Sequence, residues 1–172
     1  MEKAGIDVYL GLGSNEGDRE ANIRLALSML DDVDGVNVVK VSDLIETEPW
    51  GFNADVKFLN CAAEVFVNEQ VTPLSFLKEC KRIEKKPPKL YDLTTLQREA
   101  NRYYGMTASQ TVYHSRPIDI DILLYGKQHI DNEILTIPHP LMSERDFVMI
   151  PLRQIVSEEE KEAFPEVFKR NR

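Results

Sequence analysis

The chain has 172 residues and a formal net charge of −8, with 42% hydrophobic and 29% charged residues. This length predicts one domain with a sizeable core. A net negative charge argues against a general nucleic-acid binder, because such proteins usually carry a basic face, so we expect no nucleic-acid partner. With neither a membrane-length apolar run nor a signal peptide, we expect a cytoplasmic protein with no membrane partner, in which Cys61 and Cys80 stay reduced.

Hydrophobic periodicity predicts alternating strands and helices in the first half of the chain. Asp18 is the expected N-cap of the first helix, and Thr72-Pro73 is the expected start of the second. The second helix should bury Leu74, Leu77 and Cys80, together with Ile83 or Glu84 at its end. The apolar stripe of the first helix consists of Ile23, Ala26, Leu27 and Leu30. The expected elements are strands over 6–12, 36–46 and 57–67 and helices over 19–31 and 73–85.

The second half begins with a polar segment over 89–112, in which Thr94 or Thr95 caps a helix through Arg102. Ser157 opens a capping box with Glu160. Strands and helices mix with hairpin-like returns, which favours an α+β fold with a β-α-β-β-α-β core, an inserted segment and extra C-terminal helices. The other expected elements are a strand over 117–125, a shorter strand pairing back over 128–135, a rigid loop over 136–140 and a helix over 147–155.

Residues 116–126 carry the most informative pattern, in which isoleucines alternate with Asp119 and Asp121. This period is that of a strand with one buried face, and it places the two carboxylates on the other face, about 6.5 to 7 Å apart at their roots. Like charges that close repel unless a cation lies between them. Hard oxygen ligands suit Mg²⁺, which completes its shell with water and substrate phosphates. The alternative is a half-exposed strand with solvated aspartates, although Asp is depleted in strands.

Six separated motifs add to this pattern. They are Gly11-Leu-Gly-Ser-Asn15, Glu46-Thr-Glu-Pro-Trp-Gly51, Phe58-Leu-Asn60, Arg82-Ile-Glu84, Arg116-Pro-Ile-Asp-Ile-Asp-Ile-Leu-Leu-Tyr-Gly126, and Ile137-Pro-His139 to Arg145-x-Phe147-x-x-x-Pro151-Leu. In this order and spacing the chain resembles, over roughly residues 6–156, the 6-hydroxymethyl-7,8-dihydropterin pyrophosphokinase family of folate biosynthesis. The resemblance implies a ferredoxin-like α+β fold. It also implies an ATP-dependent diphosphotransferase that moves diphosphate from ATP to the hydroxymethyl group of 6-hydroxymethyl-7,8-dihydropterin, releasing AMP, with two Mg²⁺ ions.

The resemblance also assigns site residues by their matching positions. The matches to catalytic residues are Arg116, Asp119, Asp121 and Arg145, of which the two aspartates are the metal ligands. The matches to pterin-binding residues are Thr47, Trp50, Phe58, Asn60 and Phe147. The matches to nucleotide-binding residues are Glu84, Arg116, Thr136, His139 and Arg145. The charged residues suit a transfer that depends on positioning and charge neutralisation. The aromatic and polar residues suit a buried heterocycle that needs a matched polar rim.

Simpler explanations stay open for several of these residues. Phe58 and Phe147 could belong to the core, and His139 between prolines could fix a loop. Arg145 could be a surface ion-pair partner. Asn60 between apolar neighbours is harder to explain structurally, because a buried amide needs several partners.

The segment over 86–115 departs from the family and forms a divergent lid within a single pyrophosphokinase-like domain over 1–172, whose tail is 157–172. The expected Gly-Arg-x-Arg loop is missing, and Tyr113-His114-Ser115-Arg116 stands where the family has Trp-Gly-Pro-Arg. Arg98 and Arg102 could replace the loop arginines, or they could lie on a solvated helix face. Lys81, Ile134 and Pro140 also differ from the family on the ATP side.

Three functions follow from these observations. The first is the active enzyme, acting as a monomer on ATP and the pterin. The second is a pterin- or nucleotide-binding paralogue with weak or no transferase activity, which the altered lid would suit. The third is a ferredoxin-like effector-binding domain, which leaves the aspartate pair unexplained.

Overall fold

The computed structural model describes residues 4–48, 56–85 and 117–169. The sequence predictions for Trp50, for Arg116, for the divergent lid over 86–115 and for the helix ending at Arg102 lie outside the described residues. No described helix combines the length and the apolar character that crossing a membrane requires.

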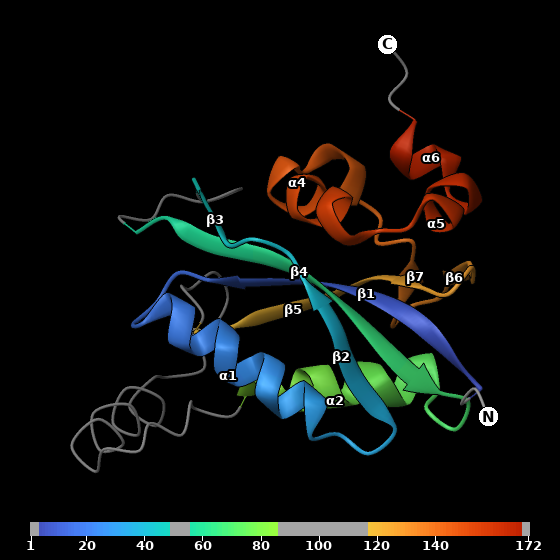
Figure 1. Cartoon of the computed structure of the whole chain (residues 1–172), viewed down its shortest axis with the longest axis horizontal. Coiled ribbons are helices and arrows are strands. Elements are labelled where there is room, and N and C mark those ends of the chain that lie inside the picture. The colour runs from blue at the N-terminus through green and yellow to red at the C-terminus, as the bar shows by residue number, and fades with distance from the viewer. Residues whose placement is uncertain (1–3, 49–55, 86–116, 170–172) are drawn as a thin grey trace.

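A five-stranded antiparallel sheet forms the centre of the described structure (Figure 1). Its strands are β1 (Gly5–Ser14), β2 (Val36–Val41), β3 (Ile45–Thr47), β4 (Phe58–Asn68) and β5 (Asp119–Tyr125). The order is β2-β4-β1-β5, and β3 pairs with β4. With one helix after β1 and another after β4, this order is that of the ferredoxin-like fold and confirms the predicted α+β core.

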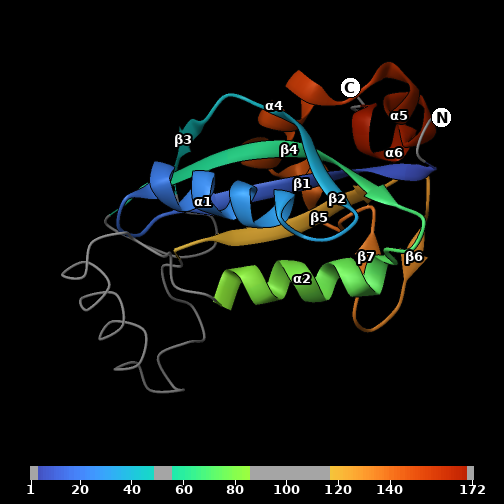
Figure 2. The ribbon, with the colours of Figure 1, turned by 60° about the horizontal axis from the view of Figure 1, so that its bottom comes forward.

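Two helices, α1 (Arg19–Asp31) and α2 (Pro73–Lys85), cover one face of the sheet (Figures 1 and 2). The predicted cap of α1 is confirmed, since the Asp18 side chain accepts a hydrogen bond from the Ala21 amide at 3.0 Å. The prediction for α2 is partly wrong. Leu74 is 44% exposed, and the buried residues are Phe76, Cys80 and Ile83, which follow the i, i+4, i+7 spacing of one helical face.

The C-terminal helices cover the opposite face of the sheet (Figure 1). They are η2 (Met142–Glu144), α4 (Asp146–Ile155), α5 (Glu158–Ala163) and α6 (Pro165–Phe168). Tyr9 and Ala62 from the sheet pack with Leu152 and Phe164 from the helices in a second hydrophobic core. Ser157 caps α5 and hydrogen-bonds to the Glu160 carboxylate, as its sequence predicted.

The predicted strand over 36–46 is divided in the structure. Ser42 interrupts it, because its N–H donates to the Ala62 carbonyl while its hydroxyl accepts from the Ala62 amide. The predicted strand over 128–135 is also wrong in detail. It is replaced by β6 (Ile130–Asp131) and β7 (Thr136–Ile137), a separate two-stranded sheet that takes in the start of the predicted loop.

Candidate active site

A cavity of about 200 Å³ opens between β1, β3, β4, β5 and the start of α4. It brings together predicted residues that lie up to 100 positions apart in the sequence (147 − 47). The residues that line it are Gly11, Leu12, Gly13, Thr47, Glu48, Phe58, Asn60, Cys61, Asp119, Asp121, Arg145, Phe147 and Val148. All predicted pterin-binding residues within the described ranges are therefore on its walls.

Short contacts between neighbouring strands position the polar rim of this cavity. Thr47 and Phe58 face each other across the β3–β4 ladder. The Asn60 amide, which is 6% exposed, donates to the Thr47 hydroxyl at 2.6 Å. Gly13 on β1 leaves room for Asn60, because a Cβ at position 13 would lie 2.7 Å from the Asn60 Oδ1. The strand predicted over 6–12 ended before Gly13, although glycine in a strand often marks such a close approach.

The two strand aspartates lie on the wall of this cavity as the alternation of β5 predicted. The side chains of Ile118, Ile120 and Ile122 are buried in the core on the face covered by α1 and α2. Those of Asp119 and Asp121 project toward the opposite face. Burial, together with the neighbouring Asp119 charge, raises the pKa of Asp121 to about 7.

Repulsion between the two neighbouring carboxylates favours the binding of a cation. A divalent ion would relieve the repulsion, and carboxylate oxygens are its preferred ligands. Among the described residues, no group of three or more His, Cys, Asp or Glu side chains is arranged to hold a metal. Two carboxylates leave coordination positions for oxygens of a substrate or of water.

Arg145 supplies positive charge beside these carboxylates. It precedes the first turn of α4 and lines the cavity, and its guanidinium lies 5.8 Å from the centre of the Phe147 ring. Its charge favours the ionised form of Asp121. The arrangement therefore places a planar cationic group next to an aromatic wall and an acidic pair.

A second cavity, of about 230 Å³, adjoins the first along the outer edge of β5. Thr136 and His139 line it together with Lys81 and Asp121, so Asp121 borders both cavities. The His139 amide donates to the Leu123 carbonyl at 3.0 Å, which fixes the loop. Burial and the Arg145 charge lower the pKa of His139, which favours the neutral form of its imidazole.

Glu84 has a position that sequence reasoning did not anticipate. Its carboxylate accepts a hydrogen bond from the Ile120 amide at 2.8 Å and pairs with Lys81 at 3.1 Å. Ile120 lies between the two aspartates, so Glu84 holds the main chain of the acidic strand. Burial raises the pKa of this carboxyl. The predicted nucleotide-binding role of Glu84 stays a prediction.

Comparisons with known proteins agree with this geometry. The model of the 7,8-dihydro-6-hydroxymethylpterin-pyrophosphokinase family matches residues 9–157. A 2-amino-4-hydroxy-6-hydroxymethyldihydropteridine pyrophosphokinase of Bacillus subtilis is 37% identical over 155 residues, which cover 90% of this chain and 81% of the relative. The enzyme of that name from Porphyromonas gingivalis is 38% identical over 150 residues, covering 86% and 89%.

Solved structures are similar in fold. A Plasmodium falciparum HPPK-DHPS triple mutant with SDX-DHP has a TM-score of 0.57 and 16% identity over 88% of this chain and 41% of that chain. An HPPK-DHPS in complex with substrates has a TM-score of 0.59 and 14% identity over 95% of this chain and 44% of that chain. The chain therefore belongs to the 7,8-dihydro-6-hydroxymethylpterin-pyrophosphokinase family, and it is an ATP-dependent diphosphotransferase of folate biosynthesis that acts on hydroxymethyldihydropterin.

Proposed function

We propose that the diphosphate transfer takes place where the two cavities meet at Asp121, with the pterin in the first cavity and the nucleotide in the second. The observation that carries this assignment is that Asp121 borders both cavities. A hydroxymethyl group held in the first cavity and a phosphate chain reaching in from the second would meet beside its carboxylate. Positioning of this kind supplies most of the catalysis in such transfers.

Thr47, Phe58, Asn60 and Phe147 would hold the pterin. The two phenylalanines, both partly buried, offer flat apolar surfaces to the ring, and the amide and hydroxyl offer donors and acceptors to its polar edge. Trp50, outside the described residues, would extend this rim. Polar groups already held in place lose little entropy on binding, and the Asn60–Thr47 hydrogen bond provides such preorganisation.

Asp119 and Asp121 would hold two Mg²⁺ ions against the triphosphate of ATP. When bound, these ions neutralise the phosphate charge and stabilise the attacking and leaving oxygens. Arg145, and Arg116 outside the described residues, would add guanidinium contacts to phosphate oxygens. On the nucleotide side, Thr136 and His139 lie beside Asp121, and the buried His139 Nδ1 has no hydrogen-bond partner among the described residues.

The proposed reaction forms one bond to phosphorus and breaks another. The hydroxymethyl oxygen forms a bond to the β-phosphorus of ATP, and the bond from that phosphorus to the oxygen bridging the α-phosphate breaks. That oxygen leaves with AMP, and the hydroxyl proton passes to solvent. Because one chain lines both cavities, we propose that a monomer is sufficient.

One assay tests the assignment. The protein is incubated with Mg²⁺, ATP and hydroxymethyldihydropterin, and AMP is quantified for the wild type, Asp121→Ala and Asp131→Ala. Asp131 is an exposed aspartate of β6 and serves as the matched control. AMP release that is lost only in Asp121→Ala supports the proposal. Tight pterin binding without AMP in the wild type would instead favour the binding paralogue.

A further inference from the structure

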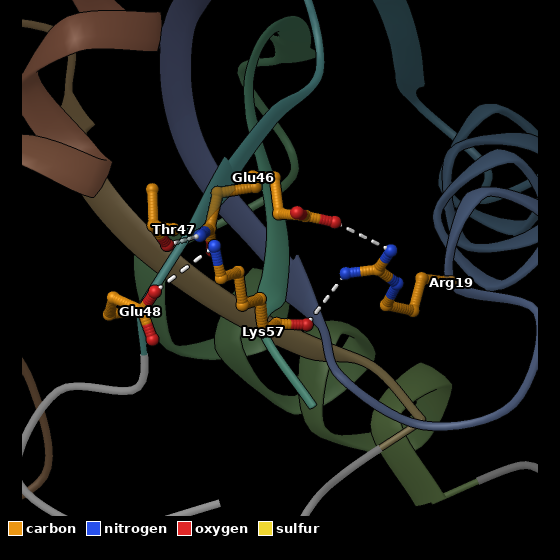
Figure 3. Close-up of polar contacts among 6 residues, drawn as sticks. Arg19, Glu46, Thr47, Glu48 and Lys57 are labelled. Atoms are coloured by element: carbon orange, nitrogen blue, oxygen red, sulfur yellow. Dashed lines mark hydrogen bonds and ion pairs between the residues drawn. The ribbon is translucent and has the colours of Figure 1, made fainter. Parts of the chain in front are cut away.

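Arg19, at the first position of α1, connects two strands of the sheet through its guanidinium group (Figure 3). Its Nη1 donates to the Lys57 carbonyl at 2.7 Å, and its Nη2 donates to the Glu46 carboxylate at 2.8 Å. The arginine comes from the helix that follows β1, whereas its acceptors belong to β3 and to the residue before β4. One planar fork therefore joins three segments that are distant in sequence.

Both acceptors are direct neighbours of cavity residues. Glu46 precedes Thr47 and Lys57 precedes Phe58, and Thr47 and Phe58 are paired across the ladder. β3 has only three residues, and β4 is its one partner among the described strands, so few ladder hydrogen bonds hold it. The Arg19 contacts hold the end of this short ladder just where it borders the cavity.

Hydrogen bonds on both sides of Arg19 hold the start of α1 in place. Asp18 caps α1, and the buried Asn22 donates to the Ser14 hydroxyl at 3.2 Å and to the Glu16 carbonyl at 2.7 Å. These contacts connect α1 to the end of β1, where Gly13 also lines the cavity. Arg19 thus connects the β1 wall of the cavity to the β3–β4 wall.

A second ion pair lies beside this contact and can be tested separately. Lys57 Nζ approaches the Glu48 carboxylate at 3.1 Å (Figure 3). Both side chains are largely exposed. Removal of the Lys57 side chain leaves its carbonyl available to Arg19. An exposed pair of this kind contributes little, whereas the Arg19 side chain is 26% exposed and makes two contacts.

We propose that Arg19 is a positioning residue for the pterin: it holds the short strand β3 against the start of β4, and it acts through Thr47 and Phe58 without touching the ligand. This inference rests on the proposed pterin site. It predicts that loss of the Arg19 side chain weakens pterin binding but not nucleotide binding, because the second cavity shares no residue with the β3–β4 wall.

The test compares Arg19→Ala with Arg24→Ala. Arg24 lies on the same helix, is 71% exposed and pairs with Glu20, four residues earlier on that helix, at 2.6 Å. We expect Arg19→Ala to raise the pterin dissociation constant about tenfold, equivalent to ~1.4 kcal/mol. The dissociation constant of a non-hydrolysable ATP analogue, measured with Mg²⁺, should change less than about twofold. Arg24→Ala should leave both constants at the wild-type values, and so should Lys57→Ala.

Arg19→Lys and Glu46→Gln separate positioning from folding. Lysine retains the charge but cannot reach both acceptors, so we expect partial rescue of pterin affinity. Thermal unfolding of every variant shows whether the fold is intact. An equal loss of pterin and nucleotide affinity, or no loss of either in a folded Arg19→Ala, would overturn the inference.

Asn60→Ala distinguishes failure of this inference from failure of the proposed pterin site. If Asn60→Ala abolishes pterin binding while Arg19→Ala does not, only the role of Arg19 is refuted. If neither variant weakens pterin binding, the proposed site is refuted.

Discussion

At the residue scale, Asp121 is the side chain whose environment departs furthest from that of an ordinary carboxylate. Burial and the adjacent Asp119 raise its pKa to about 7, and it borders both cavities. A carboxylate that is costly to ionise without a cation is well suited to bind one with a substrate.

Asp121→Asn should reduce AMP release by about 10²-fold or more, because the amide cannot neutralise a metal ion. The pterin dissociation constant should change far less, by about threefold at most, because the ring contacts come from other residues. Steady-state AMP assays and pterin titrations measure the two effects. Equal losses in both would mean that the carboxylate supports the fold and not the transfer.

The same substitution should stabilise the metal-free protein at alkaline pH. Because folding raises the Asp121 pKa from 3.8 to about 7, the stabilising contribution of this group is present below its unfolded pKa and is lost as the pH rises through about 7. In EDTA, the unfolding free energy of Asp121→Asn relative to the wild type should therefore be higher at about pH 8 than at about pH 4. Glu64, Glu84 and Glu160 also have raised pKa values but are common to both proteins. A difference that did not vary with pH would contradict the assignment.

Gly13→Ala should weaken pterin binding about tenfold, because the new Cβ would lie 2.7 Å from the Asn60 Oδ1 and displace that amide. Gly11→Ala is the matched comparison, since its Cβ would meet the Leu123 side chain at an ordinary 3.6 Å. Its effect on pterin titration should be clearly smaller. If both variants bound equally well, the position of Asn60 would not limit binding.

At the element scale, β5 shows how much of a site strand can be predicted locally. The alternation of isoleucine and aspartate predicted the buried and the cavity-facing sides of β5, and both are confirmed. Its outer edge was not predictable, because the partner of the Ile120 amide is Glu84, 36 residues earlier on α2. The division of 36–46 into β2 and β3 has a similar cause, since Ser42 bonds to Ala62 of another strand.

Glu84→Ala should raise the Mg²⁺ concentration needed for half-maximal AMP release several-fold, because β5 loses the acceptor that holds the chain between its aspartates. Glu84→Gln retains an acceptor for the Ile120 amide and should have the weaker effect. Glu79→Ala, on the same helix and paired with Arg82 near the surface, is the control. Identical Mg²⁺ curves for Glu84→Ala and Glu79→Ala would refute this role.

At the scale of the whole molecule, the first cavity exists because α4 packs across the sheet on the side opposite α1 and α2 (Figures 1 and 2). α4 carries Phe147, and Arg145 precedes it, so its docking brings the C-terminal third of the chain to the β3–β4 wall. Leu152 is fully buried in that interface, whereas Ile150 on the same helix is 51% exposed.

Leu152→Ala should lower the free energy of unfolding by ~2–5 kcal/mol, the usual effect of a cavity in a packed core. Ile150→Ala should change it by less than ~0.5 kcal/mol. Urea denaturation of the two variants measures the difference. Similar small losses in both would mean that α4 is only loosely docked on the sheet.

The sequence by itself determined the features that depend on neighbouring residues: the strand alternation around Asp119 and Asp121, the Asp18 and Ser157 caps, the α+β class and, through its separated motifs, the family. Even within one helix its pattern was ambiguous, since Cys80 fits both a stripe that starts at Leu74 with i, i+3, i+6 spacing and one that starts at Phe76 with i, i+4, i+7 spacing. Only the tertiary structure decided which stripe is buried, that Asp121 borders both cavities, and that Glu84 bonds to Ile120. These outcomes depend on side chains packed together from distant segments, whose adjacency arises only when the sheet and both helical layers assemble.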